Sequence, residues 1–233
     1  MIKIKQLIGE TLFPLSFTCD CCGIETFKNN LCPACLKKLR YNNDATCPVC
    51  GRKTPLNEIC MECKKTPPYF EQAVSPLIYD GTAIKLINKF KNGYAYLKDY
   101  FANLIIQKIS VFPIIDYITY VPMTKRAERK RGYNQSKLLA ESVGEKLNVP
   151  VISTVIKIND TAEQKNLSVK ERVENLEKSF KTQTQTNLKL KTVLLIDDIM
   201  TTGNTANALC KKLVPMGTLN IFFASVASVE YKH

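Results

Sequence analysis

Eight cysteines in four CxxC pairs dominate the amino-terminal part of the chain. The pairs are Cys19 and Cys22, Cys32 and Cys35, Cys47 and Cys50, and Cys60 and Cys63, and nine of the ten cysteines lie between residues 19 and 63. A CxxC pair lets two thiolates meet one ion from a tight turn, and four sulfurs complete the tetrahedral shell of a structural zinc ion. Four pairs therefore predict two zinc ions.

The pairing of these cysteines has alternatives. In the simplest, sequential scheme the first four cysteines bind one zinc and the last four bind the other. Spacing alone leaves an interleaved pairing open, and Cys21 offers an alternative register beside Cys22. Closed four-thiolate shells have no open coordination position, so we assign these zincs no catalytic role. Buried or redox-active cysteines without metal are the competing interpretation, which the pair spacing disfavours.

The cysteine-rich stretch ends at two consecutive prolines, 67 and 68, which favour an extended linker. We expect an amphipathic helix within residues 1–17, a double zinc ribbon over 18–66 and a larger domain over 71–233. The first residues are interrupted by polar and glycine positions where a signal peptide needs a continuous apolar run. No apolar run approaches the roughly 20 residues that span a bilayer. We therefore expect a soluble, cytoplasmic protein.

Strand and helix patterns alternate after the linker. We predict strands at 73–81, 117–122, 149–158, 192–197 and 219–228, and helices at 82–90, 96–109, 136–147 and 204–213. This alternation implies an α/β fold with a mostly parallel sheet covered by helices on both faces. Pro76 places the first strand at an edge. Segment 159–191 is polar and has no strand pattern, and a loop of that length is typical of a functional lid.

Residues 193–205, VLLIDDIMTTGNT, combine a strand, two aspartates and a polar turn. Asp197 and Asp198 follow the strand, and ligands of open parallel sheets bind outside the carboxyl ends of strands. Paired carboxylates there can accept hydrogen bonds from a vicinal diol or hold Mg²⁺. The next residues form a phosphate cradle of hydroxyls, a glycine and a helix N-terminus: Thr201, Thr202, Gly203, Asn204 and Thr205. Simple helix capping beside solvated aspartates is the weaker alternative.

A basic stretch follows the strand predicted at 117–122. Its cations are Lys125, Arg126, Arg129, Lys130 and Arg131, in a loop at the strand's carboxyl end. We expect this loop to face the acid pair, where guanidinium groups would bind a pyrophosphate. In isolation the stretch would be an ordinary solvated charge run. The net charge of +12 attracts polyanions, but it does not choose among phosphorylated ligands, nucleic acid and acidic membranes.

The sequence resembles known families. VLLIDDIMTTGNT resembles the phosphoribosyl pyrophosphate (PRPP) motif of type I phosphoribosyltransferases, which implies Asp197 and Asp198 on the ribose hydroxyls, residues 201–205 around the 5′-phosphate, and Mg²⁺ with PRPP. With YVPMTKRAERKRGYNQSKLLAE (120–141), AEQKNLSVKERVENLEKSF (162–180) and the CxxC pairs, nearly the whole chain resembles ComF-type competence proteins. Segment 162–180 falls where related transferases carry a hood over the site, which makes Gln164, Arg172 and Asn175 candidate ligand contacts.

The ComF resemblance implies a type I phosphoribosyltransferase-like fold that acts in DNA uptake during natural transformation. Single-stranded DNA, the ComF-associated helicase and other DNA-uptake proteins are then the expected partners. A catalysed reaction would displace pyrophosphate from C1 of Mg-bound PRPP through an oxocarbenium-like state. However, Thr201 stands where hypoxanthine-guanine transferases place an aspartate general base, and the single histidine, His233, is the terminal residue. We therefore assign no catalytic residue and no acceptor. A catalytically silent fold that binds DNA and a zinc-ribbon adaptor remain alternatives.

Overall fold

The computed structural model describes residues 17–26, 31–159, 169–183 and 186–230. The predicted amino-terminal helix, Gln164 and His233 lie outside these residues. None of the helices in the described ranges combines the length and apolar character needed to cross a membrane.

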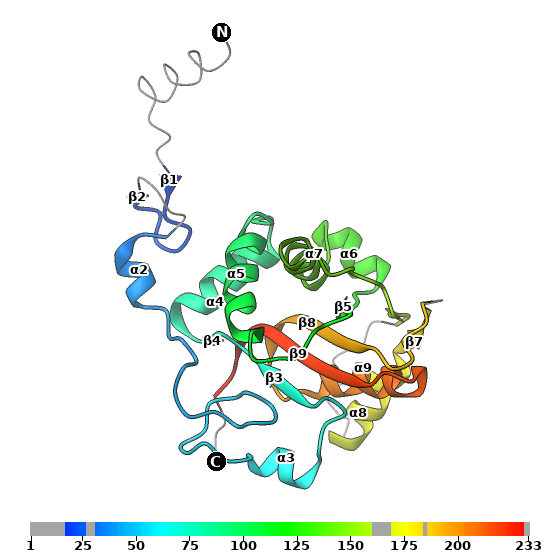
Figure 1. Ribbon diagram of the computed structural model, residues 1–233. Coiled ribbons are helices and arrows are strands. Elements are labelled where there is room, and N and C mark those ends of the chain that lie inside the picture. Colours follow the sequence, from blue (N-terminus) through cyan, green and yellow to red (C-terminus); the bar gives the residue numbers. More distant parts are fainter. Residues whose placement is uncertain (1–16, 27–30, 160–168, 184–185, 231–233) are drawn as a thin grey trace.

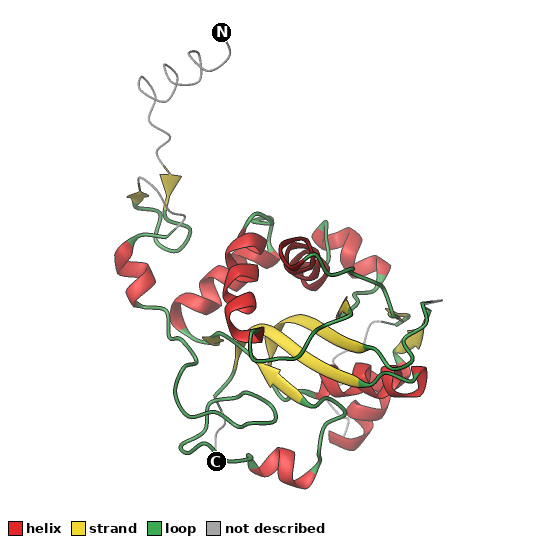
Figure 2. Cartoon of the chain, in the orientation of Figure 1, coloured by secondary structure: helices red, strands yellow, loops and turns green. Residues whose placement is uncertain are grey.

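A five-stranded parallel sheet forms the centre of the molecule (Figure 2). Its strands are β3 (Gln72–Val74), β4 (Leu77–Ile78), β5 (Tyr117–Tyr120), β8 (Thr192–Met200) and β9 (Asn220–Ser228). The order is β3-β9-β8-β5, and β4 also pairs with β9. Pro76 separates β3 from β4 at the edge of the sheet, where a residue without an N–H is tolerated. The predicted parallel α/β fold is thus confirmed.

Helices cover both faces of this sheet (Figure 1). The helices are α4 (Gly81–Lys91), α5 (Leu97–Ile109) and α7 (Gln135–Leu147) on one face, and α8 (Val169–Lys178) and α9 (Asn204–Leu213), followed by the 3-10 helix η1 (Val214–Met216), on the other. Successive β8 side chains alternate between the two layers: Leu194 belongs to the apolar cluster that contains residues of α4, α5 and α7, while Leu195 belongs to the cluster that contains residues of α9. The four predicted helices are confirmed.

The two cysteine-rich ribbons join different layers of the core. The first ribbon contains β1 (Phe17–Thr18), β2 (Glu25–Thr26) and α2 (Pro33–Lys37), and its buried cysteines belong to the same apolar cluster as α4 and α5. The second ribbon ends in α3 (Met61–Lys65), and its four cysteines belong to the cluster on the α9 face. In Figure 1 the strands of the first ribbon project away from the sheet, whereas α3 lies below it.

The strand predicted at 149–158 is largely wrong. Ile118 of β5 donates to Pro150 O and accepts from Ile152 N, each at 2.9 Å, but this bridge does not extend. Thr154 instead exchanges a side-chain hydrogen bond with Thr119 at 2.8 Å, so the chain turns away from β5. Beyond it, β6 (Val155–Lys157) pairs antiparallel with β7 (Phe180–Thr182) in a separate small sheet.

The prediction of a long loop over 159–191 is also wrong for the described part, because α8 and β7 lie there. The apolar face of α8 is narrow, and most of its residues are polar or charged, so the sequence shows no clear helical period of apolar residues. Leu176 packs into the α9-face core, and Glu177 forms an ion pair with Lys211 of α9 at 2.8 Å. Arg172 and Asn175 both belong to α8, and Asn175 is exposed.

Candidate functional site: an acid pair and a phosphate loop

The acid pair lies inside β8, not after it as predicted. Pairing with β9 continues to Met200, opposite Ser228, whereas pairing with β5 ends at Ile196, opposite Tyr120. Because β5 stops short, Asp197 and Asp198 are open to the segment that follows β5. The pair therefore lies at the carboxyl edge of a parallel sheet, which is where such sheets bind ligands.

Asp197 is held by two donors. Ser136 Oγ, at the start of α7, donates to Asp197 Oδ1 at 2.7 Å, and the backbone N–H of Asp198 donates to the same oxygen at 2.8 Å. Burial raises the pKa of the Asp197 carboxyl to about 7, and the neighbouring Asp198 charge adds to the rise despite the two donors. This carboxyl is thus poised to change charge near neutral pH.

Asp198 is paired with a lysine that the sequence analysis did not select. Lys91 Nζ lies 2.9 Å from Asp198 Oδ2, and Asp198 is only 5% exposed. Lys91 is the last residue of α4, more than a hundred positions before the acid pair in sequence. The sequence feature that could have identified Lys91 is its position at a predicted helix end, immediately before the Asn92-Gly93 turn. This ammonium supplies the positive charge that a buried carboxylate requires.

The conspicuous RGYNQS stretch, 131–136, supports both partners of the acid pair. Tyr133 Oη donates to Phe90 O and accepts from Gly93 N at 3.2 Å, so it braces the end of α4 that carries Lys91. Asn134 caps α7 by accepting from Ser136 N at 2.9 Å, and its Nδ2 donates to Val121 O at 3.0 Å. The segment 131–136 therefore positions Lys91 through the backbone at the end of α4, and it positions Ser136 through the cap of α7.

The predicted phosphate loop forms the entry to α9. Gly203 has φ 81°, a left-handed conformation that other residues rarely adopt, and α9 begins at Asn204. Thr202 Oγ1 accepts from Asn204 N at 3.4 Å. Thr201, Thr202 and Asn204 are exposed, and Thr205 is half-buried. Hydroxyls and the amino end of a ten-residue helix thus face outward beside the acid pair.

The basic stretch is a helix, α6 (Lys125–Arg131), and not the predicted loop. Thr124 caps its start by accepting from Ala127 N at 3.2 Å, and Gly132, with φ 94°, ends it. This spacing of a threonine cap and a glycine stop was the missed signal. Four of its cations are exposed: Lys125, Arg126, Arg129 and Lys130. Arg131 instead donates to Gln135 Oε1 at 2.5 Å. The helix follows β5 and so lies at the same edge of the sheet as the acid pair.

The eight cysteines form two clusters. One holds Cys19, Cys22, Cys32 and Cys35, the other Cys47, Cys50, Cys60 and Cys63, and within each cluster all ligand atoms lie within 4.8 Å of one another. This grouping is the sequential one, and it uses Cys22 and not Cys21. Backbone N–H groups point at the sulfurs, as Cys32 N does at Cys19 Sγ (3.3 Å) and Cys60 N at Cys47 Sγ (3.4 Å). Such donors stabilise thiolates, so both clusters fit structural zinc ions.

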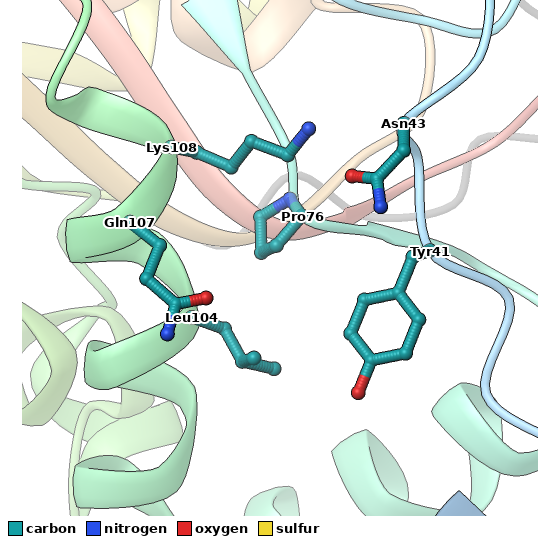
Figure 3. Close-up of a pocket in the computed structure, with 6 residues that line it drawn as sticks. All are labelled: Tyr41, Asn43, Pro76, Leu104, Gln107 and Lys108. Atoms are coloured by element: carbon teal, nitrogen blue, oxygen red, sulfur yellow. The ribbon is translucent and has the colours of Figure 1, made fainter. Parts of the chain in front are cut away.

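A separate cavity of about 580 Å³ lies between α5 and the segment that follows the first ribbon (Figure 3). It is lined by Tyr41, Asn43, Pro76, Leu104, Gln107 and Lys108, and so by neither the acid pair nor the phosphate loop. Lys108 Nζ donates to Asn42 O at 2.8 Å, and burial lowers the pKa of this ammonium. The lysine ties α5 to the chain between the two ribbons.

Comparisons with known proteins find similarity over parts of the chain. Residues 8–64 match the family model described as a double zinc ribbon domain. Competence protein F of Haemophilus influenzae is 34% identical over 103 residues, which cover 43% of this chain and 45% of that protein. DNA utilization protein YhgH of Salmonella typhi is 28% identical over 127 residues, covering 52% and 55%. Over about half of its length the chain is therefore similar to competence protein F and YhgH, and it carries a double zinc ribbon at its amino-terminal end. It spans about half the length of the relatives it matches.

Solved phosphoribosyltransferases align with about two thirds of the chain at low identity. The adenine phosphoribosyltransferase of Leishmania tarentolae is 13% identical with a TM-score of 0.40, covering 66% of this chain and 78% of that one. The corresponding enzyme of Thermoanaerobacter pseudethanolicus is 15% identical with a TM-score of 0.39, covering 69% and 92%. The parallel order of the sheet follows from its own strand pairing.

Proposed function

We propose that the acid pair and the loop after β8 bind PRPP, or another ribose 5-phosphate, together with Mg²⁺. The observation that carries this proposal is the adjacency of two kinds of group within nine residues of chain. Asp197 and Asp198 lie at the carboxyl edge of the sheet, and Gly203 then opens the amino end of α9. A ribose 5-phosphate carries both matching groups in one small molecule: a vicinal diol that carboxylates can bind and a phosphate that a helix N-terminus can bind.

Each element has a role in this proposal. The two carboxylates would accept hydrogen bonds from the ribose hydroxyls, and residues 201–205 would surround the 5′-phosphate. The exposed cations of α6, at the same edge, would face the pyrophosphate. When bound, Mg²⁺ would neutralise the pyrophosphate oxygens. Thr201 offers no carboxylate as a general base, so the residues support binding more directly than they support proton transfer to an acceptor.

The test is calorimetric titration of the zinc-loaded protein with PRPP and Mg²⁺. We expect saturable binding by the wild type and none by the Asp197→Asn, Asp198→Asn double variant. The matched control is Asp116→Asn, because Asp116 lies at the opposite end of β5, next to Lys191. Its removal should leave binding intact. The proposal is wrong if the wild type gives no binding heat at millimolar PRPP.

We further propose that the protein acts in DNA uptake, as the names of its relatives, competence protein F and DNA utilization protein YhgH, suggest for them. The exposed cations of α6 support single-stranded DNA as a partner, since phosphate contacts supply most of the affinity for nucleic acid. The ComF-associated helicase and other DNA-uptake proteins are candidate partners, with the zinc ribbons as docking modules.

DNA binding can be separated from ribose-phosphate binding. In fluorescence anisotropy with a labelled single strand, Arg126→Ala with Arg129→Ala should weaken binding and reduce the salt slope by about 0.7 for each lost phosphate contact. The double aspartate variant should bind DNA as the wild type does. An unchanged salt slope in the arginine variant would exclude α6 as the DNA surface.

A further inference from the structure

Arg52 connects the second cysteine cluster to the phosphate loop. It lies between two ligand cysteines, is only 4% exposed, and directs its guanidinium at four acceptors. Nε donates to Cys50 Sγ at 3.4 Å, Nη2 to Cys60 Sγ at 3.7 Å and to the Glu62 carboxylate, and Nη1 to the backbone oxygen of Thr201 at 3.4 Å. Residues 149 positions apart in sequence are thus joined by one side chain.

The ribbon around Arg52 is fixed to the sheet. Val49 O accepts from Ala73 N of β3 at 2.8 Å. Gly51, with φ 66°, passes so close to β3 that a Cβ there would lie 2.3 Å from Ala73 O. The cluster's cysteines share an apolar core with Met200 and Ala206, which flank the phosphate loop on both sides. The cluster that holds Arg52 is therefore fixed relative to the sheet, and Arg52 is a buried side chain with a defined position relative to the phosphate loop.

The contact at Thr201 also orients a neighbouring donor. In a trans peptide the C=O and the following N–H point in opposite directions across one rigid plane. By holding Thr201 O, Arg52 therefore turns the Thr202 N–H away from the ribbon. Thr201 and Thr202 are both exposed, so a phosphate can approach this loop from solvent.

We propose that Arg52 is a positioning residue that couples zinc retention in the second cluster to the conformation of the phosphate loop. Four thiolates around Zn²⁺ carry net negative charge, which holds the guanidinium in place. Loss of the metal removes that hold and loosens the loop, and by reciprocity a ligand that orders the loop raises the affinity of the cluster for zinc, which we expect to slow zinc release. The first cluster provides an internal comparison, because it packs against α4 and α5 on the other face. The ligand half of this proposal rests on the proposed function, whereas the loop half does not.

The first experiment needs no ligand and no variant that alters a cysteine. Hydrogen exchange is measured on a peptide spanning residues 197–206 in the full-length, zinc-loaded protein and in Arg52→Met, with Glu62→Gln as the control that removes an Arg52 partner outside the loop. We expect exchange about tenfold faster in Arg52→Met and little changed in Glu62→Gln. If Arg52→Met retains both zincs and exchanges as the wild type does, the proposal is wrong.

The second experiment needs no Arg52 variant, so it remains decisive if Arg52→Met fails to fold. Zinc release to a chromogenic chelator is followed with and without Mg²⁺ and PRPP. We expect the ligand to slow one of the two release phases several-fold and to leave the other unchanged, and Cys22→Ser, in the first cluster, should abolish the insensitive phase. The coupling is wrong if the ligand slows both zinc-release phases equally. It is also wrong if calorimetry shows that the ligand binds but neither phase becomes slower. If the wild type binds no PRPP, the proposed function is wrong. The hydrogen-exchange experiment then tests by itself whether Arg52 orders the phosphate loop.

Discussion

Lys91 Nζ and Asp198 Oδ2 are 2.9 Å apart, which pairs the last residue of α4 with the second acid of β8. Both side chains are largely withdrawn from water, with 24% of the lysine and 8% of the aspartate side chain exposed. Charges in such a setting depend on each other, because removal of one leaves the other desolvated without a partner. The ion pair therefore holds the Asp198 carboxylate in place in the absence of a ligand.

Substitution of Lys91 tests this dependence. Lys91→Met should lower the free energy of unfolding by roughly 2–3 kcal/mol, because Asp198 loses its counter-charge. The double variant with Asp198→Asn should recover much of that loss, since neither charge remains. Urea denaturation of the single and double variants measures the coupling. Lys85→Met, at an exposed position of the same helix, should stay within about 0.5 kcal/mol of the wild type. Additive effects of the two substitutions would show that the ion pair carries no coupling energy.

The raised pKa of Asp197, about 7 in the folded protein, predicts how stability varies with pH. An aspartate in an unfolded chain titrates near pH 3.9, so between about pH 4 and pH 7 the native state holds a proton that the unfolded state has released. The free energy of unfolding should therefore fall as the pH rises through that window and level off above pH 7. Relative to Asp197→Asn, which cannot titrate, the wild type should lose about 2.5 kcal/mol between pH 5 and pH 8.

Urea denaturation of both proteins at several pH values gives this difference directly. Ser136→Ala provides a second check, because loss of its hydrogen bond to Asp197 Oδ1 removes a donor that favours the charged carboxyl. The pH window should then shift upward. A wild type and an Asp197→Asn variant whose stabilities run in parallel from pH 5 to pH 8 would contradict the raised pKa.

Local patterns predicted much of the fold. The helices at 82–90, 96–109 and 204–213 were recoverable because each has an apolar face of helical period bounded by a turn or glycine, and β8 and β9 because they are continuous apolar runs. The two missed helices share a physical cause. Six of the seven α6 residues and six of the ten α8 residues are charged, so capping and contacts with the rest of the fold, more than periodicity, determine these helices.

The site was predictable only where it is contiguous in sequence. The acid pair and residues 201–205 form a single motif, whereas Lys91 and Arg52 reach it from other parts of the chain. Only its place at the helix end, before the Asn92-Gly93 turn, distinguishes Lys91 locally from the lysines at 85 and 89 of the same helix, and the Tyr133 contacts that brace this end of α4 come from a distant part of the sequence. Long-range contacts of this kind exist only once the sheet has formed.

Tyr133 should act on the site through Lys91. Tyr133→Phe removes the hydroxyl that bonds Phe90 O and Gly93 N, which should cost about 1 kcal/mol of stability. It should also weaken Mg-PRPP binding in calorimetry, because the end of α4 is no longer held. Tyr94→Phe is the matched control, in the same turn but with its ring against Tyr96. In a Lys91→Met background the effect of Tyr133→Phe on binding should disappear. An equal effect in both backgrounds would mean that Tyr133 acts by another route.

Gly203 allows the sharpest separation of stability from binding, because Gly217 has almost the same backbone conformation, with φ 79° against 81°. Alanine at either position must adopt a left-handed conformation, which costs about 1–2 kcal/mol. At Gly203, within the phosphate loop, the new Cβ would also lie 3.0 Å from Met200 Cε. At Gly217, near the opposite end of β8, it would lie 3.4 Å from Lys189 Cα. Both variants should therefore unfold at similarly reduced denaturant concentrations, but only Gly203→Ala should bind Mg-PRPP at least tenfold more weakly, a change of about 1.4 kcal/mol. Equal affinities in the two variants would mean that the turn at Gly203 serves folding alone and that the phosphate is held elsewhere.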